Sequence, residues 1–367
     1  MHVLLVTHHA PPHIGGVERL ADMEARALAE AGHQVTWITS QSTGLDEVPA
    51  YPAAVQVVRV PAWHILEHKF GIAYPLFGPG LLTTLWRSVG QADVVHAHGF
   101  VFLNSVLSLV MAYLRRKPSL LTDHGGLHRY SSQFATFLMR LAVESLGRIS
   151  ARLATQLVAY NQRVGQLLQR LSGQPDKLLF LPNPVDRQRF YPVSPDVRCT
   201  LRNRWGWNNR PKVIFVGRLV EDKGVRRLLA AADCSFDLLF CGPAEPDLQQ
   251  LVEQSGATYL PPRPSAELPP LYQAADVLAL PSWNEGFPLV IQEALCCGLP
   301  VVTCYDPGYA PYASLPGLTF CEPSPASLRA CLLSTLSHPP LSTEPGDFFP
   351  TQQTWVVRLI ESISQMS

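Results

Sequence analysis

The sequence PSWNEGFPLVIQEALCCGLPVVT occupies residues 281–303 and predicts a loop, a helix and a strand. Residues 276–280 (DVLAL) precede it and form a short apolar run that predicts another strand. Pro288 suits the first turn of the helix, because the N–H that proline lacks would have no partner inside the helix there. The N–H groups between Phe287 and Val290 would then be available to a phosphate. The stretch therefore predicts a phosphate-binding helix start that follows a buried strand.

Two carboxylates, Glu285 and Glu293, stand on either side of this helix start. Acidic groups repel phosphate, so they are better suited to accept hydrogen bonds from hydroxyl groups. A ligand with phosphates in the middle and hydroxyl-rich groups at both ends, such as a nucleotide sugar, fits this arrangement. The alternative is purely structural: Glu285 would cap the helix, and Glu293 would be a solvated helical residue.

The segment resembles the donor-site motif of the retaining glycosyltransferases of family 4, whose pattern is PS-x-x-E-G-F-P-L-V-x-x-E-A. In that family the second glutamate binds the ribose of the donor nucleotide, and the first faces the sugar. The resemblance implies these roles for Glu293 and Glu285. It also implies that the backbone between them meets the diphosphate, at Gly286, Phe287, Leu289 and Val290.

The composition is that of a globular chain with two domains. Its 367 residues exceed what one hydrophobic core usually supports, and 47% hydrophobic with 16% charged residues excludes wholesale disorder. Lysine and arginine together number 29, and so do aspartate and glutamate. The neutral balance gives no reason to expect nucleic acid as a partner.

The cysteines and the apolar runs predict a cytoplasmic protein. All eight cysteines lie between Cys199 and Cys331, none at the paired spacing of a metal site, and the start MHVLLVTHH lacks the features of a signal peptide. The longest apolar run, residues 100–114, is too short to span a bilayer and is followed by Arg115, Arg116 and Lys117. It predicts a buried helix with a basic end or, as in some family 4 relatives, a peripheral contact with the inner face of the membrane.

The first half of the chain alternates short apolar runs with segments of helical periodicity. A helix is expected at residues 18–31, where Gly32 ends it. Strands that are apolar at consecutive positions are typical of a parallel sheet covered on both faces, so a doubly wound α/β domain is expected. The predicted strands are residues 3–7, 35–39, 57–60, 94–98, 120–123, 157–160 and 178–181.

The loop after the first strand, HHAPPHIGGVER, contains Gly15 and Gly16. Glycines at the carboxyl end of a strand let the backbone approach a ligand closely. No third glycine follows at the spacing of a dinucleotide fingerprint, which disfavours a nicotinamide dehydrogenase. Within the resemblance, this loop takes the place of the family's glycine-rich loop in the first domain and would contact the donor.

Several histidines stand at predicted strand ends. His96 and His98 would share one face of a strand, but no acidic or cysteine partner stands at a recognisable spacing, so no metal site is expected. The segment DVVHAHG resembles a family segment whose histidines are largely structural. The next strand ends in TDHGG, and the resemblance implies that His124 points into the cleft near the donor sugar.

The second half restarts the α/β rhythm with strands at residues 212–216, 237–241, 258–260, 276–280 and 300–303. The loop GRLVEDKG follows the first of them and contains Arg218 and Lys223. It resembles the family's G-R-L-x-x-x-K-G, whose two cations neutralise the donor diphosphate. Residues 192–211 lack a strong apolar period and are expected to link the domains. The predicted domains are residues 1–191, on the acceptor side, and 192–349, on the donor side, with a helix in residues 350–367 returning to the first.

The resemblance implies the GT-B fold, two Rossmann-like domains with parallel sheets that face each other across a cleft. The implied reaction is transfer of a hexosyl group, with retention, from a UDP- or GDP-sugar to a hydroxyl of a glycan, a lipid-linked acceptor or a small molecule. No Asp-x-Asp occurs, so neither a metal nor another cofactor is expected. The predicted catalytic residues are Arg218, Lys223, His124 and Glu285. A GT-B epimerase that hydrolyses nucleotide sugars and a non-catalytic nucleotide-sugar-binding protein are the alternatives.

Overall fold

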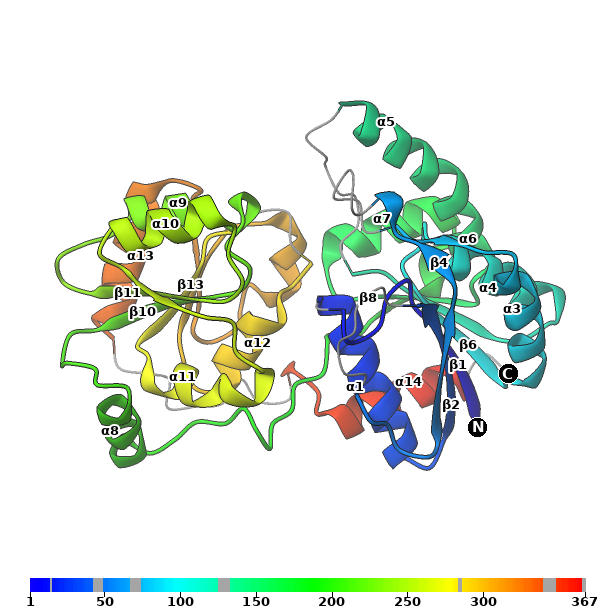
Figure 1. Cartoon of the computed structure of the whole chain (residues 1–367), viewed down its shortest axis with the longest axis horizontal. Coiled ribbons are helices and arrows are strands. Elements are labelled where there is room, and N and C mark those ends of the chain that lie inside the picture. The colour runs from blue at the N-terminus through cyan, green and yellow to red at the C-terminus, as the bar shows by residue number, and fades with distance from the viewer. Residues whose placement is uncertain are drawn as a thin grey trace. The chain divides into compact units, whose positions relative to one another are not determined.

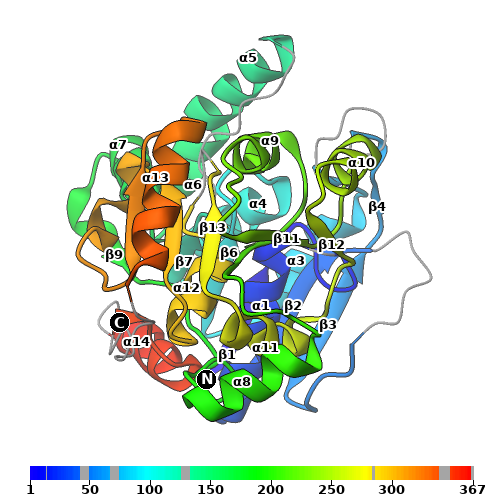
Figure 2. The same cartoon turned by 90° about the vertical axis from the view of Figure 1, so that its left-hand side faces the viewer.

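The structure is a computed structural model that describes residues 1–13, 15–41, 49–66, 74–124, 133–282, 286–338 and 348–364, with the backbone alone at 133–135. The chain divides into two compact units. The N-terminal unit comprises Met1–Asn183 and Gln352–Ser367, and the C-terminal unit comprises Pro184–Thr351. Both units are α/β, with helices on the two faces of a parallel sheet (Figures 1 and 2).

The sheet of the N-terminal unit has seven strands in the order β3-β2-β1-β6-β7-β8-β9, and each neighbouring pair is parallel. All seven predicted strands exist, and β6 has the predicted bounds. The central strands are buried because helices cover both of their faces. The strands are β1 (His2–Val6), β2 (Gln34–Ser40), β3 (Val55–Val60), β6 (Val94–His98), β7 (Ser119–Thr122), β8 (Gln156–Ala159) and β9 (Leu178–Phe180).

The helices of this unit pack on the sheet through separate apolar clusters. Leu28 of α1 and Trp355 of α14 share one core with β1, and Leu85 of α3 and Met111 of α4 share another. A short antiparallel pair, β4 (Ala62–Trp63) and β5 (Leu76–Phe77), lies outside the main sheet. The helices are α1 (Gly16–Glu30), α3 (Gly80–Gln91), α4 (Leu103–Leu114), α5 (Gln133–Ala142), α6 (Arg148–Leu153), α7 (Gln162–Ser172) and α14 (Gln352–Ser364).

The C-terminal unit has a six-stranded parallel sheet in the order β12-β11-β10-β13-β14-β15. The strand β15 was not predicted. The strands are β10 (Lys212–Val216), β11 (Asp237–Cys241), β12 (Thr258–Leu260), β13 (Val277–Leu280), β14 (Val301–Cys304) and β15 (Leu318–Cys321). The helices are α8 (Pro195–Arg204), α9 (Val225–Ala230), α10 (Pro246–Gln254), α11 (Pro269–Ala274), α12 (Leu289–Cys296) and α13 (Pro325–Leu336).

The predicted linker at residues 192–211 contains helix α8 and lies within the C-terminal unit. Ser194 caps the helix by accepting a hydrogen bond from the Val197 amide. The helix buries no side chain and is held by charge instead: Arg198 and Arg202 donate to the two oxygens of Asp276, at 2.6 and 2.8 Å. A helix that docks by ion pairs needs no apolar period, which explains why the sequence pattern missed it.

The boundary between the units falls after Asn183, before the predicted boundary at residue 191. Residues just beyond it already pack on the C-terminal unit. The amide of Val185 donates to the Pro350 carbonyl at 3.0 Å, and the Gln273 side chain donates to the Tyr191 carbonyl at 2.9 Å. These bonds fix the segment to the second unit.

Strand order reverses once in each sheet, and this positions the candidate site. In the C-terminal unit the chain runs from β10 through β11 to β12 on one side and from β13 through β14 to β15 on the other. The chain leaves the two central strands toward opposite sides of the sheet, and ligands of open parallel sheets bind at this point, beyond the carboxyl ends of the strands. The loops after β10 and β13 are the two segments that carry the strongest motifs.

Candidate functional site: a donor site in the C-terminal unit

The loops after β10 and β13 pack directly against each other. Gly224 has φ +74°, and a β-carbon built on it would lie 2.2 Å from the carbonyl oxygen of Pro281. Arg227 of α9 donates to the same oxygen at 2.7 Å. Only glycine permits both this backbone conformation and this close approach. The sequence interpretation assigned no role to Gly224 or Arg227, although both lie in or next to the GRLVEDKG motif.

The two predicted cations, Arg218 and Lys223, lie on the first of these loops. Arg218 is exposed and forms no ion pair with any residue that the structure describes. Lys223 is half-buried and ends a single 3-10 turn, Glu221–Lys223. Between them Leu219 is buried, and its amide donates to the Pro243 carbonyl at 2.7 Å. The loop is thus fixed at Leu219, while the guanidinium of Arg218 is exposed to solvent.

A helix, α12, begins at Leu289 near the predicted position, but Pro288 precedes it as the N-cap, with ψ 136°, and does not lie in its first turn. Gly286, Leu289 and Val290 are half-buried. The Ile291 amide donates to the Pro288 carbonyl at 3.1 Å, whereas helix geometry leaves the amides of Leu289 and Val290 without an acceptor inside the helix. The Gln292 side chain donates to the Phe287 carbonyl at 3.1 Å and fixes the chain entering the helix. The helix start therefore presents backbone donors from a constrained loop.

Phe287, a predicted donor-binding residue, has its side chain in an aromatic cluster. The ring is 2% exposed and stacks on Tyr312 at 3.7 Å, with Tyr309 edge-on at 5.3 Å. Only the backbone of Phe287 remains for a ligand. The two tyrosines belong to the 3-10 segment Pro307–Tyr312, so this segment packs against the donor-site loop.

Glu293 lies on α12 and is 3% exposed, with the Tyr272 hydroxyl 3.3 Å from its Oε2. Such burial contradicts the alternative of a solvated helical glutamate. Burying a carboxylate costs free energy unless its oxygens accept hydrogen bonds. A buried glutamate is therefore suited to accept hydrogen bonds from ligand hydroxyls. Glu285 lies outside the residues that the structure describes.

In the N-terminal unit, Gly15 is the N-cap of α1 and Gly16 is its first residue. The buried carboxylate of Glu18 leaves no room for a side chain at Gly15. A β-carbon on Gly15 would lie 2.1 Å from Oε2 of Glu18, whereas one on Gly16 would meet nothing within 4 Å. Glu18 Oε1 lies 3.1 Å from Nδ1 of His13. Burial opposes ionisation of Glu18, but the bond from His13 and the charge of His8 outweigh it, so its pKa is lowered.

His124 follows the end of β7 and is held at both its backbone and its ring. The Tyr160 hydroxyl donates to the His124 carbonyl at 2.5 Å. The His124 ring stacks on that of His98 with an interplanar angle of 7°, and its Nε2 lies 2.8 Å from Nδ1 of His98. Burial, followed by the charge of His98, lowers the pKa of His124 well below its ordinary value, so the ring is neutral.

His98 and His96 are not simply paired with each other, because both contact Glu24 of α1. Glu24 Oε1 lies 2.5 Å from His96 Nδ1, and Oε2 lies 3.1 Å from His98 Nε2. Burial would raise the pKa of Glu24, but the charge of His96 and the bonds from both histidines lower it to about 2. These three side chains could also surround a metal ion.

The sequence interpretation found no acidic partner for these histidines at a recognisable spacing, and the structure supplies a distant one, Glu24. Glu24 lies on the same helix face as the buried residues Leu20, Ala21 and Leu28. A carboxylate on an apolar helix face needs a buried partner. That was the signal in the sequence, but spacing along the chain could not reveal it, since Glu24 and His98 meet only through the packing of α1 on β6.

Comparison with known proteins places the chain in a family. Residues 14–189 match Glycosyltransferase Family 4, and residues 197–341 match Glycosyl transferases group 1. The chain is 30% identical over 346 residues to D-inositol 3-phosphate glycosyltransferase of Salinispora tropica, covering 81% of this chain and 70% of that one.

A second relative is the GDP-mannose-dependent alpha-(1-6)-phosphatidylinositol monomannoside mannosyltransferase of Mycolicibacterium smegmatis, 28% identical over 86% of this chain and 84% of that one. The structure is similar to Anabaena HepE in complex with UDP, with a TM-score of 0.75, 19% identity and 100% coverage of both chains. The predicted GT-B fold class is confirmed. The chain therefore belongs to glycosyltransferase family 4, in the group 1 glycosyl transferases, and is a glycosyltransferase that uses a nucleotide sugar.

Proposed function

We propose that the protein is a retaining, metal-independent hexosyltransferase that takes its sugar from a UDP- or GDP-sugar. The observation that carries this proposal is the packing of the Arg218–Lys223 loop on the Pro281 loop through Gly224. That contact supports a site in which the two cations and the start of α12 would face the same ligand. A diphosphate in this site would meet both sources of positive potential.

In this proposal the diphosphate is the leaving group, and its growing charge is what the site stabilises. The bond from the anomeric carbon to the β-phosphate oxygen breaks, and its electron pair stays on that oxygen. Arg218, Lys223 and the amides of Leu289 and Val290 stabilise the oxygen. The acceptor oxygen bonds to the anomeric carbon on the same face, and its proton passes to the departing phosphate oxygen. No protein base is needed for that transfer.

The other predicted site residues would bind the ribose at one end of the donor and the sugar at the other. Glu293 would accept hydrogen bonds from the ribose hydroxyls, and its buried position beside the Tyr272 hydroxyl supports this role. Glu285 would face the sugar. Gly15, Gly16 and His124 would supply contacts from the N-terminal unit.

We also propose a glycolipid or another cell-surface glycan as the product. The name of the Mycolicibacterium smegmatis relative specifies a phosphatidylinositol monomannoside acceptor. A lipid-borne acceptor requires an enzyme that can reach a membrane surface. No helix within the described ranges is long and apolar enough to cross a bilayer.

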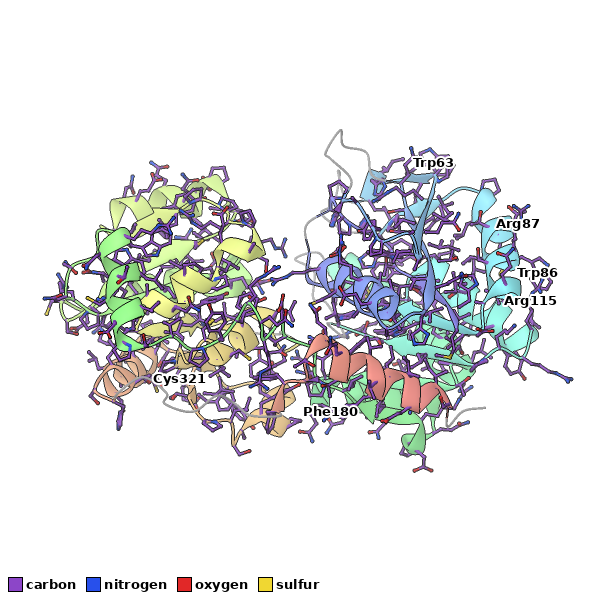
Figure 3. All side chains as sticks on the ribbon, turned by 90° about the horizontal axis from the view of Figure 1, so that it is seen from below. Trp63, Trp86, Arg87, Arg115, Phe180 and Cys321 are labelled. Atoms are coloured by element: carbon purple, nitrogen blue, oxygen red, sulfur yellow. The ribbon has the colours of Figure 1, made fainter. Side chains whose placement is uncertain are left out.

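The surface proposed to contact the inner face of the membrane joins the middle of α3 to the C-terminal end of α4. Trp86 is 49% exposed and Leu114 is 65% exposed. The Arg115 guanidinium lies 3.9 Å from the Trp86 ring centre, and Figure 3 shows this pair beside Arg87. Exposed aromatic and basic groups together favour an interface with anionic lipid.

A vesicle experiment tests the membrane contact. Cosedimentation with vesicles of phosphatidylglycerol and phosphatidylcholine should weaken by about thirtyfold when Arg87 and Arg116 are both changed to glutamine. The matched control changes Arg204 and Arg226, two exposed arginines of the C-terminal unit. Equal loss in both double variants would exclude a specific lipid-facing surface.

A panel of UDP- and GDP-sugars tests the transferase. The matching donor should raise the apparent melting temperature and transfer its sugar to an acceptor with retention, in excess EDTA as well as without it. Release of free sugar or an epimer without any acceptor would instead support an epimerase or hydrolase. Stabilisation without turnover would support a binding protein. Complete, metal-reversible loss in EDTA would contradict metal independence.

A further inference from the structure

A chain of hydrogen bonds runs from a buried carboxylate to the candidate donor-facing histidine. Glu24 and His98 are 1% and 0% exposed, whereas His124 is half-buried. Glu24 Oε2 lies 3.1 Å from His98 Nε2, and His98 Nδ1 lies 2.8 Å from His124 Nε2. The three residues come from α1, β6 and the loop after β7, so the fold builds this chain from separate elements.

The direction of each bond follows from the groups that make it. Burial, followed by the charge of His96, lowers the pKa of His98, so its ring is neutral and carries one N–H. The ionised Glu24 can only accept, so the proton of His98 is on Nε2. Its Nδ1 is then an acceptor, and His124 must donate to it from Nε2.

The second branch of the cluster does not change this result. His96 contacts the other oxygen of Glu24, and its Nε2 lies 2.7 Å from the Thr122 hydroxyl. A hydroxyl can donate or accept, so Thr122 suits either proton arrangement of His96. His96 therefore imposes no constraint on His98.

A metal ion between Glu24, His96 and His98 is less consistent with this geometry. Both oxygens of Glu24 already lie at hydrogen-bond distance from a ring nitrogen. A metal ion would have to replace both of these hydrogen bonds. The Nε2–H group of His98 could then no longer donate to Glu24. The observed distances are explained fully by hydrogen bonds.

We propose that Glu24 and His98 are positioning residues that hold His124 as the Nε2–H tautomer, which leaves its Nδ1 as the acceptor that the ring offers to a ligand hydroxyl. Within the described residues, Nδ1 of His124 has no hydrogen-bond partner. A fixed acceptor discriminates for a sugar hydroxyl at that position and against a group that cannot donate. The identity of the ligand rests on the proposed function, but the tautomer does not.

Two substitutions of His98 separate the halves of the chain. The amide of asparagine reaches the place of the imidazole Nδ1, and that of glutamine reaches the place of Nε2. His98→Asn therefore keeps an acceptor for His124 and loses the bond to Glu24. His98→Gln keeps a donor for Glu24 and loses the acceptor for His124. Both variants remove the same ring, so they differ in which contact survives.

The primary test is nitrogen NMR of protein labelled with [15N]histidine, with the His124 signals assigned through His124→Gln. The wild-type ring should show a protonated Nε2 and an unprotonated Nδ1. His98→Asn should retain this pattern, and His98→Gln should give a mixture of tautomers or the reverse pattern. A wild-type Nδ1–H tautomer, a cationic His124, or equal spectra in the two variants would overturn the proposal. A change on adding EDTA would overturn it too, because it would indicate a metal.

Turnover supplies the second readout. His98→Gln should lower kcat about tenfold more than His98→Asn, which is the usual effect of losing one well-placed hydrogen bond. If the two His98 variants had equal kcat values but the expected NMR spectra, His98 would control the tautomer of His124 without affecting catalysis. If no nucleotide sugar is a substrate, the spectra still decide whether His98 controls His124, so failure of the proposed function remains distinguishable.

Discussion

The two units carry different titratable side chains. All histidines except His338 lie in the N-terminal unit, and all eight cysteines lie in the C-terminal unit. In the first unit, Glu24 and His98 are buried and bonded to each other. In the second, Arg218 is exposed on a loop whose backbone is hydrogen-bonded on both sides of it, from Gly217 to the Cys241 carbonyl and from Leu219 to the Pro243 carbonyl.

This difference indicates a division of labour between the units. A buried, internally satisfied network cannot neutralise an incoming diphosphate, but it can hold one ring in one orientation. Exposed cations on an anchored loop can neutralise a diphosphate, and they act where charge grows. We therefore expect substitutions in the C-terminal unit to affect the chemistry most, and substitutions in the N-terminal unit to affect geometry and pH response.

The largest effect is expected from Lys223→Ala. Removing a preorganised donor from the developing diphosphate charge should lower kcat by on the order of a hundred to a thousand fold, with a much smaller change in donor affinity. Steady-state kinetics with direct donor titration measures both. Arg226→Ala is the control, since Arg226 is an exposed cation nearby that pairs with Glu221 at 3.1 Å. A loss confined to donor binding would contradict a role in the transition state.

The next effect concerns Glu293, whose proposed ligand groups do not change during the reaction. Glu293→Gln should raise the donor KM by about ten to a hundredfold and change kcat less, because hydrogen bonds to a charged group contribute about 1.5–3 kcal/mol. Tyr272→Phe removes only the hydroxyl 3.3 Å from Glu293 and should have a smaller effect in the same direction. Unchanged donor binding in Glu293→Gln would show that this carboxylate is structural.

A smaller effect should come from separating the two donor-site loops. Gly224→Ala places a methyl group 2.2 Å from the Pro281 carbonyl, so the loops must move apart and donor affinity should fall about tenfold. Gly256→Ala is the matched control in the same unit, because Gly256 has φ +80° but nothing within 4 Å of a β-carbon. Both variants should lose about 1 kcal/mol of stability from backbone strain. Equal donor affinity in the two would show that the loop contact does not shape the site.

The sequence predicted some features of the fold and the candidate site and missed others. Residues in the loops after β10 and β13 were predictable because strand ends, glycines and cations follow one another along a short segment. The bounds of β6, β10 and β11 were also predictable, since periodicity is a local property. Helix α8 was not, because ion pairs to Asp276 replace an apolar face. The contacts of Glu24 with His98 were not either, because they depend on how α1 packs on the sheet.

The N-terminal unit is tested by the response of its stability to pH. Burial lowers the pKa of His8 to about 3, and burial lowers the pKa of His98 and His124 as well. In the unfolded chain these rings have pKa values of about 6.5. Below pH 6.5 the unfolded state therefore binds protons that the folded state excludes, and stability must fall as the pH falls.

Linkage sets the size of this response. Each excluded proton lowers the free energy of unfolding by about 1.4 kcal/mol per pH unit once the pH is below 6.5. Glu24 acts in the same direction at lower pH: its pKa is lowered to about 2, so the stability that it contributes is present above pH 4.5 and is lost toward pH 2. Amide hydrogen exchange, corrected for intrinsic rates, should show the opening free energy of β6 falling between pH 6.5 and 5.5 while that of β10 stays nearly constant. Because the same molecules report both strands, an equal decrease in β6 and β10 would contradict the assignment of this response to the buried histidines.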